Sequence, residues 1–169
     1  MDRITAELKE KTSKIKMLIM DVDGTMTDGK IYIGLSGEEF KAFNVKDGYG
    51  IKLLHENSIR TAIITGRESE IVKHRARELN IEDIFQGIHN KVEKYEIIKD
   101  KYNLRDDEIA HIGDDINDVS IFNKVGLKIA VADAIDEIKS MADIITIKRG
   151  GDGAVREIID IILRVKESI

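Results

Sequence analysis

Two short apolar runs in this sequence each end in a pair of aspartates. Asp21 and Asp23 close the first run, and Asp114 and Asp115 close the second. Strands of this kind deliver their terminal carboxylates to the carboxyl edge of a parallel sheet, where open α/β sheets bind ligands. Two converging strand ends would crowd like charges unless a cation lies between them, and oxygen ligands suit Mg²⁺. The pattern therefore predicts a magnesium-dependent site.

The order of the remaining segments predicts an α/β fold with a Rossmann-like, doubly wound parallel sheet. Short β-branched runs alternate with segments of helical spacing, which is typical of repeated βαβ units. The predicted strands are Lys16–Met20, Thr61–Ile64, Asp83–Phe85, Ile109–Ile112, Leu127–Val131 and Asp143–Ile147. The predicted helices are Gly50–Glu56, Glu68–Leu79, Lys91–Tyr102, Val119–Val125, Ala134–Met141 and Ala154–Lys166.

One segment interrupts this alternation. Apolar stretches at 31–33 and 40–43 flank Gly34-Leu35-Ser36-Gly37, which predicts a β-hairpin flap within residues 27–46 that overhangs the first carboxylate pair. No segment is long enough for a separate cap domain. The 169 residues thus form one predicted domain, with a lead-in helix at 1–15 and a glycine-rich segment followed by a helix at 148–169.

Composition excludes several classes of function. A net charge of −5 with no basic stripe argues against nucleic-acid binding. No stretch approaches the roughly 20 apolar residues needed to span a bilayer, so no membrane role is expected. The chain has no cysteine and no signal-peptide pattern, so we expect a cytoplasmic protein.

The segment Asp21-Val22-Asp23-Gly24-Thr25 carries the strongest catalytic signal. Two carboxylates one residue apart can divide roles, with one attacking as a nucleophile while the other transfers protons. Gly24 allows a sharp backbone turn after them. An ordinary acidic strand-to-loop junction is the alternative, but the full pattern after a buried strand favours catalysis.

Thr65 follows a second predicted strand and precedes Gly66 and a helix. Its hydroxyl and the neighbouring backbone N–H groups offer the donors that a phosphoryl oxygen needs. The alternative is a helix N-cap that forms a capping box with Glu68.

Lys91 lies between a weak strand and a helix at the same predicted edge. There it can neutralise both a nucleophilic carboxylate and a phosphoryl group. Without this position it would be an ordinary surface lysine.

Three carboxylates surround the end of the second apolar run. Asp114 is the natural direct metal ligand. Asp115 and Asp118 can orient the waters of the metal or Lys91 from outside the ligand shell. Asp118 can equally be a carboxylate that complements a helix N-terminus.

The chain resembles the haloacid dehalogenase superfamily of phosphotransferases. Four ordered motifs carry the resemblance: Asp21-Val22-Asp23-Gly24-Thr25, Thr65, Lys91 and Gly113-Asp114-Asp115. The resemblance implies that Asp21 is phosphorylated, that Asp23 is the acid/base, and that Mg²⁺ is bound by the Asp21 carboxylate, the Asp23 backbone carbonyl and Asp114.

Three further stretches resemble the cap-less subfamily of 3-deoxy-D-manno-octulosonate 8-phosphate phosphatases: Asp28-Gly29, 41–50 and 150–157. This implies a homotetramer in which a neighbour's hairpin and carboxyl-terminal segment help enclose the site. It also implies a sugar-acid phosphate as substrate, contacted by Asp23, Asn44, Val45, Lys46, Asp47, Gly48, Arg67, Arg75 and Lys91.

Arg67 and Arg75 suit the carboxylate of such a substrate, because the planar guanidinium group of arginine can form two parallel hydrogen bonds to a carboxylate. Arg75 lies two helical turns after Arg67 and can face the same side, although a solvated helix charge is an equal alternative for Arg75. For Arg156 the equal alternative is a salt-bridged charge. His111, within a buried strand, is expected to be a hydrogen-bonded core histidine.

Three other functions stay open at this point. A phosphatase for a nine-carbon sugar acid, such as an N-acylneuraminate 9-phosphate, would use the same scaffold, although Arg67 favours the eight-carbon substrate by resemblance. A non-catalytic receiver domain also gathers acidic residues, a threonine and a lysine at a sheet edge, but it would not need Asp23. An assembly domain that has lost activity would not need the complete motifs.

Overall fold

The computed structural model describes residues 5–168, apart from the side chains of Glu38 and Glu39. Its centre is a six-stranded sheet in the order β5-β4-β1-β6-β7-β8, in which all neighbouring strands are parallel. The strands are β1 (Met17–Met20), β4 (Arg60–Ile64), β5 (Asp83–Phe85), β6 (Ile109–Gly113), β7 (Leu127–Ala130) and β8 (Ile144–Ile145). The predicted doubly wound parallel sheet is confirmed.

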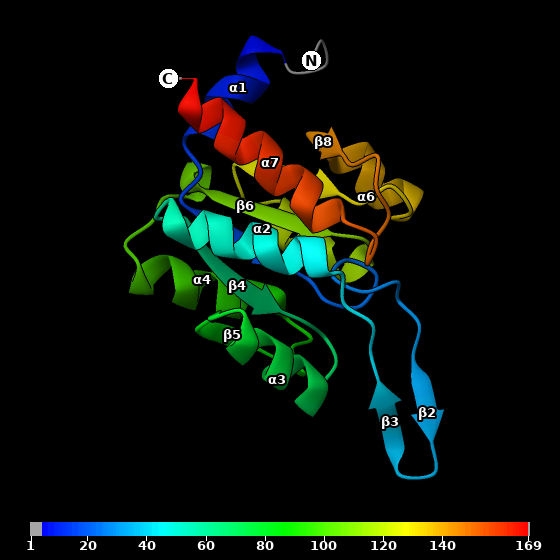
Figure 1. The fold of residues 1–169 in the computed structure, drawn as a ribbon. Coiled ribbons are helices and arrows are strands. Elements are labelled where there is room, and N and C mark those ends of the chain that lie inside the picture. The colour runs from blue at the N-terminus through cyan, green and yellow to red at the C-terminus, as the bar shows by residue number, and fades with distance from the viewer. Residues whose placement is uncertain (1–4, 169) are drawn as a thin grey trace.

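The helices cover both faces of this sheet because successive side chains of each strand point to opposite sides. Leu18 and Met20 of β1 join one apolar cluster, whereas Met17 and Ile19 join the other. The first cluster includes residues of α2, α3, α6 and α7, and the second includes residues of α4 (Figure 1). Helix α5 contributes Phe122 to the first cluster and Ile121 to the second. The helices are α1 (Ala6–Ser13), α2 (Val45–Glu56), α3 (Glu70–Glu78), α4 (Lys91–Lys101), α5 (Val119–Phe122), α6 (Asp136–Met141) and α7 (Ala154–Glu167).

The predicted hairpin exists, but its second strand was placed too late. It consists of β2 (Tyr32–Gly34) and β3 (Gly37–Phe40), which project from the body of the molecule (Figure 1). Only Leu35 and Ser36 separate the strands, so pairing resumes at Gly37, where φ is +112°. Residues 41–43, predicted as strand, instead lead irregularly into α2.

Helix α2 begins five residues before the predicted Gly50, because Asn44 caps it. The Asn44 side chain accepts a hydrogen bond of 2.8 Å from the backbone N–H of Lys46. Two glycines inside the helix make room for other elements. A Cβ at Gly48 would lie 2.6 Å from Arg75, and one at Gly50 would lie 2.9 Å from Arg156 of α7.

The remaining differences lie at element ends. Helices α3, α5 and α6 and strand β8 are shorter than predicted. Helix α1 packs beside α7, and residues 1–4 of the predicted lead-in helix lie outside the described residues. No helix within residues 5–168 has the length and apolarity to cross a membrane. The same residues contain no inserted cap domain.

Candidate active site

Three neighbouring strands end in the side chains that the sequence singled out. Asp21 follows β1, Thr65 follows β4 and Asp114 follows β6, and β1 lies between the other two in the sheet. All three strands run in the same direction, so their carboxyl ends meet at one edge. Thr65 does not cap α3, because that helix starts at Glu70 after Ser69.

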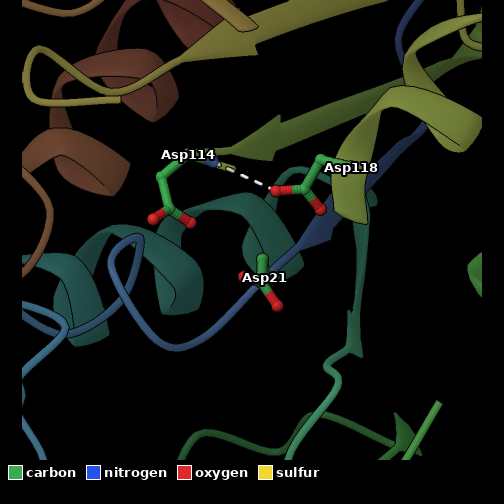
Figure 2. A group of neighbouring side chains, drawn as sticks. All are labelled: Asp21, Asp114 and Asp118. Carbon is green, nitrogen blue, oxygen red and sulfur yellow. Dashed lines mark hydrogen bonds between the residues drawn. The ribbon is translucent and has the colours of Figure 1, made fainter. Parts of the chain in front are cut away.

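Asp21, Asp114 and Asp118 form a compact acidic cluster (Figure 2). Each offers an oxygen, and these oxygens all lie within 4.8 Å of one another. Asp118 is fully buried, and both of its oxygens are already engaged. Oδ1 accepts from Lys91 and His111, and Oδ2 accepts from the backbone N–H of Asp114 at 3.1 Å. Because these contacts engage both oxygens of Asp118, Asp21 and Asp114 are the better candidates for direct metal ligands.

Lys91 is the buried cation of the site. Its Nζ lies 2.9 Å from Asp21 Oδ1 and 2.7 Å from Asp118 Oδ1, and its side chain is completely buried. Burial alone would lower the pKa of Lys91, but Asp21 and Asp118 together raise it above its usual value. Lys91 is therefore a fixed positive charge beside Asp21, as the sequence predicted from its position.

Three carboxyl groups lie together at this edge of the sheet, and the single positive charge of Lys91 does not neutralise all of them. Burial, and then the charges of Asp21 and Asp118, raise the pKa of Asp114 to about 8. Burial also raises the pKa of Asp21, which Lys91 opposes. Burial would raise the pKa of Asp118 as well, but His111 and Lys91 hold it well below its usual range. Such mutual repulsion is relieved when a cation binds among the carboxylates.

The donor set fits a hard divalent cation such as Mg²⁺. The buried Asp21 carboxylate, with Lys91 Nζ 2.9 Å from its Oδ1, offers an oxygen within 4.8 Å of an oxygen of Asp114. Asp114 is aimed into the site over Gly24, where a Cβ would lie 2.0 Å from Asp114 Oδ2. Thr25 steadies Asp114 by donating to its Oδ1 at 3.2 Å.

Asp23 points to a different pair of cations. Lys41 Nζ lies 2.5 Å from Asp23 Oδ1, and Arg67 Nε lies 3.8 Å from Asp23 Oδ2. The two motif aspartates therefore have separate surroundings, Asp21 with Lys91 and Asp23 with Lys41 and Arg67. This separation is what a division into nucleophile and acid/base requires.

The glycine-rich segment packs against the loop that follows β1 in its own chain. The backbone N–H of Gly151 donates to the Thr25 carbonyl at 3.1 Å, and the N–H of Gly150 donates to Asp133 at 3.0 Å. A Cβ at Gly150 would lie 1.8 Å from the Gly24 carbonyl oxygen. The segment thus supports the loop that carries Asp23.

Comparisons with known proteins agree with this geometry. Residues 80–158 match the family of haloacid dehalogenase-like hydrolases. The 3-deoxy-D-manno-octulosonate 8-phosphate phosphatase of Escherichia coli strain K12 is 43% identical over 160 residues, which are 95% of this chain and 85% of that protein. The chain belongs to the 3-deoxy-D-manno-octulosonate 8-phosphate phosphatase family of haloacid dehalogenase-like hydrolases.

Solved structures of this phosphatase family share the fold over almost the whole chain. The Yersinia pestis phosphatase has a TM-score of 0.94 at 42% identity, over 96% of this chain and 88% of that one. The Moraxella catarrhalis phosphatase, solved with a magnesium ion, a phosphate ion and a KDO molecule, has a TM-score of 0.92 at 39% identity, over 96% and 93%. The resemblance inferred from the motifs is confirmed.

Some residues predicted from the phosphatase family to contact substrate lie at the exposed start of α2. Val45 and Lys46 are exposed, whereas Asn44 is half-buried and directs its amide toward the Gly151 carbonyl at 3.4 Å. Gly48 is buried under Arg75. Their contacts with a phosphatase substrate stay predictions.

Asp47 and Arg75 are both less exposed than ordinary charged surface residues. Asp47 is buried, and its Oδ1 accepts from the backbone N–H of Arg156 at 2.8 Å, which joins α2 to α7. Arg75 donates to Glu78 at 3.2 Å and lies 5.7 Å from the ring of Phe43. Asp47 Oδ2 and Arg75 Nε have no hydrogen-bond partner within the described residues. A role in the phosphatase reaction stays a prediction for both.

Three further residues that the sequence singled out make contacts within the protein itself. Asp115 is exposed and accepts from the backbone N–H of Ile116 at 2.7 Å, so its outer role at the metal stays a prediction. His111 is fully buried and contacts the Ile19 carbonyl at 3.1 Å and Asp118 at 2.9 Å. It is the core histidine that the sequence indicated. Arg156 pairs with Asp160 at 2.7 Å.

Sequence reasoning missed Lys41 as a residue of the phosphatase site. It appeared only as part of a predicted strand and of the stretch 41–50 that resembles the phosphatase subfamily, with no role assigned to it. The available signal was a lone lysine enclosed by Phe40 and Phe43 next to a hairpin, where a buried ammonium needs a carboxylate partner.

Proposed function

We propose that this chain is a Mg²⁺-dependent phosphatase that hydrolyses 3-deoxy-D-manno-octulosonate 8-phosphate to the free sugar acid and inorganic phosphate. The observation that carries the proposal is the buried Asp21 carboxylate at the carboxyl end of the central strand, with Lys91 Nζ 2.9 Å from its Oδ1 and the Asp114 carboxyl beside it. A carboxylate oxygen held in this way can attack phosphorus. The names of the relatives supply the substrate.

In the first half of the proposed reaction, Asp21 forms a bond to phosphorus as the bond from phosphorus to the sugar oxygen breaks. Lys91 and Thr65 bind the phosphoryl oxygens, so catalysis consists mainly of positioning and charge stabilisation. Asp23 gives a proton to the departing sugar oxygen. In the second half, Asp23 takes a proton from the water that hydrolyses the aspartyl phosphate.

We assign the metal site to the Asp21 carboxylate, the Asp23 backbone carbonyl and Asp114. When bound there, Mg²⁺ supplies positive charge to the phosphoryl oxygens. Asp118 holds Lys91 in place, and Asp115 belongs to the surrounding shell. The magnesium ion in the Moraxella catarrhalis relative supports this choice of metal.

The sugar portion is assigned to the residues around the start of α2 and to two arginines. Arg67 is half-exposed beside Asp23, so its guanidinium can reach both the site and solvent. Arg67 and Arg75 suit the substrate carboxylate. Asn44, Val45, Lys46, Asp47 and Gly48 complete the proposed surface.

The test is steady-state release of phosphate from 3-deoxy-D-manno-octulosonate 8-phosphate with Mg²⁺, with N-acetylneuraminate 9-phosphate assayed in parallel and a chelator as control. We expect a strong preference for the eight-carbon substrate. Preference for the nine-carbon substrate would support the proposed phosphatase mechanism but contradict the proposed eight-carbon substrate. No release from either would favour a receiver or assembly domain.

We also propose that the chain forms a homotetramer in which the hairpin packs on a neighbour. The hairpin exposes Ile33, Leu35 and Phe40, and Leu35 is fully exposed. Clustered apolar side chains on a projecting element indicate an interaction surface. Light scattering should give a tetramer for the wild type and smaller species for Leu35→Asp, and a wild-type monomer would contradict the proposal. A cytoplasmic location stays a prediction from the cysteine-free sequence.

A further inference from the structure

Lys41 is a completely buried lysine that contacts Asp23. Its side chain has no exposed surface, whereas that of Asp23 is 19% exposed, and its Nζ lies 2.5 Å from Asp23 Oδ1. A completely buried ammonium is costly unless a carboxylate receives it. The pair therefore fixes one end of the Asp23 carboxylate inside the protein.

The hairpin delivers this lysine to the site. Strand β3 ends at Phe40, so Lys41 is the first residue after the projecting element, and α2 begins four residues later at Val45. Asp23 comes from the loop after β1. The ion pair thus joins two segments that are far apart in the sequence, at the point where the hairpin leaves the body.

The two oxygens of Asp23 have different neighbours. Oδ1 receives Lys41, and Oδ2 faces the more distant and half-exposed Arg67 at 3.8 Å. A lysine ammonium has donors only, so an oxygen that accepts from it cannot carry the proton that points toward it. A proton on Asp23 therefore belongs on Oδ2, whereas Oδ1 can keep its bond to Lys41 in both protonation states.

We infer that Lys41 is a positioning residue that holds Asp23 by Oδ1 and so assigns Oδ2 to proton transfer with the departing sugar oxygen. The inference rests on the proposed phosphatase function. In the step concerned, the Asp21–phosphorus bond forms, the phosphorus–oxygen bond to the sugar breaks, and the proton moves from Asp23 Oδ2 to that oxygen. Displacement of a catalytic group by about 1 Å can cost on the order of 100-fold in rate.

The test compares two leaving groups in the variant Lys41→Met. A sugar alkoxide needs a proton as it departs, whereas p-nitrophenolate departs as a stable anion. Because kcat/KM reports the steps up to formation of the aspartyl phosphate, we expect Lys41→Met to lower kcat/KM by about 100-fold for the sugar phosphate and by less than about fivefold for p-nitrophenyl phosphate. Equal losses for both substrates, or no loss for the sugar phosphate, would overturn the inference.

A double-mutant cycle shows whether Lys41 acts through Asp23. In the Asp23→Asn background, Lys41→Met should change kcat/KM for the sugar phosphate by less than about threefold, because the group that it positions no longer transfers a proton. A further loss of about 100-fold in kcat/KM on adding Lys41→Met to Asp23→Asn would contradict the inference. Lys41→Gln keeps a donor for Oδ1, and it serves as the second variant if Lys41→Met does not fold.

The control is Lys101→Met, which breaks a different ion pair between a lysine and a largely buried aspartate, Asp83. Lys101 Nζ lies 2.7 Å from Asp83 Oδ1, and the pair lies at the start of β5, away from the catalytic edge. This variant should keep the wild-type ratio of kcat/KM between the two substrates.

A structural readout separates failure of this inference from failure of the proposed function. The crystal structure of Lys41→Met should show the Asp23 carboxylate rotated away from its wild-type position. An unmoved carboxylate would overturn the role of Lys41 whatever the activity. If the wild type releases no phosphate from the sugar phosphate, the proposed function fails, and the position of Asp23 still tests the pair.

Discussion

Gly150 lies directly against the carbonyl of Gly24, so closely that a Cβ at residue 150 would be 1.8 Å from that oxygen. The contact is between two backbone segments, and neither can rotate away as a side chain would. Gly24 in turn leaves the space into which Asp114 points. The packing of a distant loop thus fixes the shape of the catalytic turn.

Gly150→Ala should therefore displace the catalytic loop. We expect a loss of about 100-fold in phosphate release and a lower Tm, because the methyl group meets backbone atoms. The control is Gly87→Asn, since a Cβ at residue 87 meets no atom within 4 Å and asparagine tolerates its φ of +68°. Wild-type activity in Gly150→Ala would show that this contact does not set the geometry of the loop.

Asp21→Asn should abolish turnover and leave the fold intact. The carboxylate is buried and its pKa is raised, so the neutral amide should not lower the Tm by more than a few degrees. We expect phosphate release to fall by at least about 1,000-fold, because the nucleophile is removed. Asp100→Asn, at an exposed carboxylate near the end of α4, is the matched comparison. Substantial activity in Asp21→Asn would end the nucleophile assignment.

Asp114→Asn should weaken binding of Mg²⁺ by about 10- to 100-fold, measured by calorimetric titration in the absence of substrate. The physical reason is the loss of one charged ligand from a site with few oxygens free to bind. In the metal-free protein the raised pKa of Asp114 means that the folded state must either bind a proton there or carry an unfavourable charge. The amide avoids both, so the metal-free variant should be at least as stable as the wild type. An unchanged titration would remove Asp114 from the metal site.

Asp47 should make stability depend on pH between about 4 and 6. Burial raises its pKa from 3.8 to about 6, which the backbone N–H of Arg156 partly opposes. The folded state therefore binds the proton more tightly than the unfolded state, and the contribution of Asp47 to stability is lost as the pH rises through this range. The full effect is on the order of 3 kcal/mol.

The measurement is urea unfolding of the wild type and Asp47→Asn at pH 4 and pH 7. The asparagine is neutral at both values and can still accept from Arg156. The free energy of unfolding of the variant relative to the wild type should therefore rise between pH 4 and pH 7. A constant difference would show that Asp47 does not titrate in this interval.

The sheet and the acidic cluster could be predicted because both follow from local pattern. Apolar runs that end in carboxylates indicate strand ends, and parallel strands bring those ends together, as Asp21 and Asp114 show. The position of Lys91 followed from the same logic. These features depend on the spacing of apolar residues and on the order of the motifs, both of which can be read directly from the sequence.

The features that escaped prediction depend on contacts between distant segments. The first turn of α2 was missed because Gly48 and Gly50 disfavour a helix locally, yet each provides space for an arginine from another helix. Lys41 was missed because its partner, Asp23, lies 18 positions earlier in the chain. The late placement of β3 came from the two-residue turn at Leu35 and Ser36, where Gly37 already resumes pairing.

Strand β1, which leads directly into Asp21, is hydrogen-bonded on both sides, to β4 and to β6, and all of its side chains are buried. Its amide protons should therefore exchange with solvent only when the whole domain unfolds, whereas those of the hairpin should exchange through local opening. Asp21, the proposed nucleophile, should thus be held by a slowly exchanging part of the protein. Asp23, in contrast, contacts Lys41 at the base of the hairpin, where exchange should be faster.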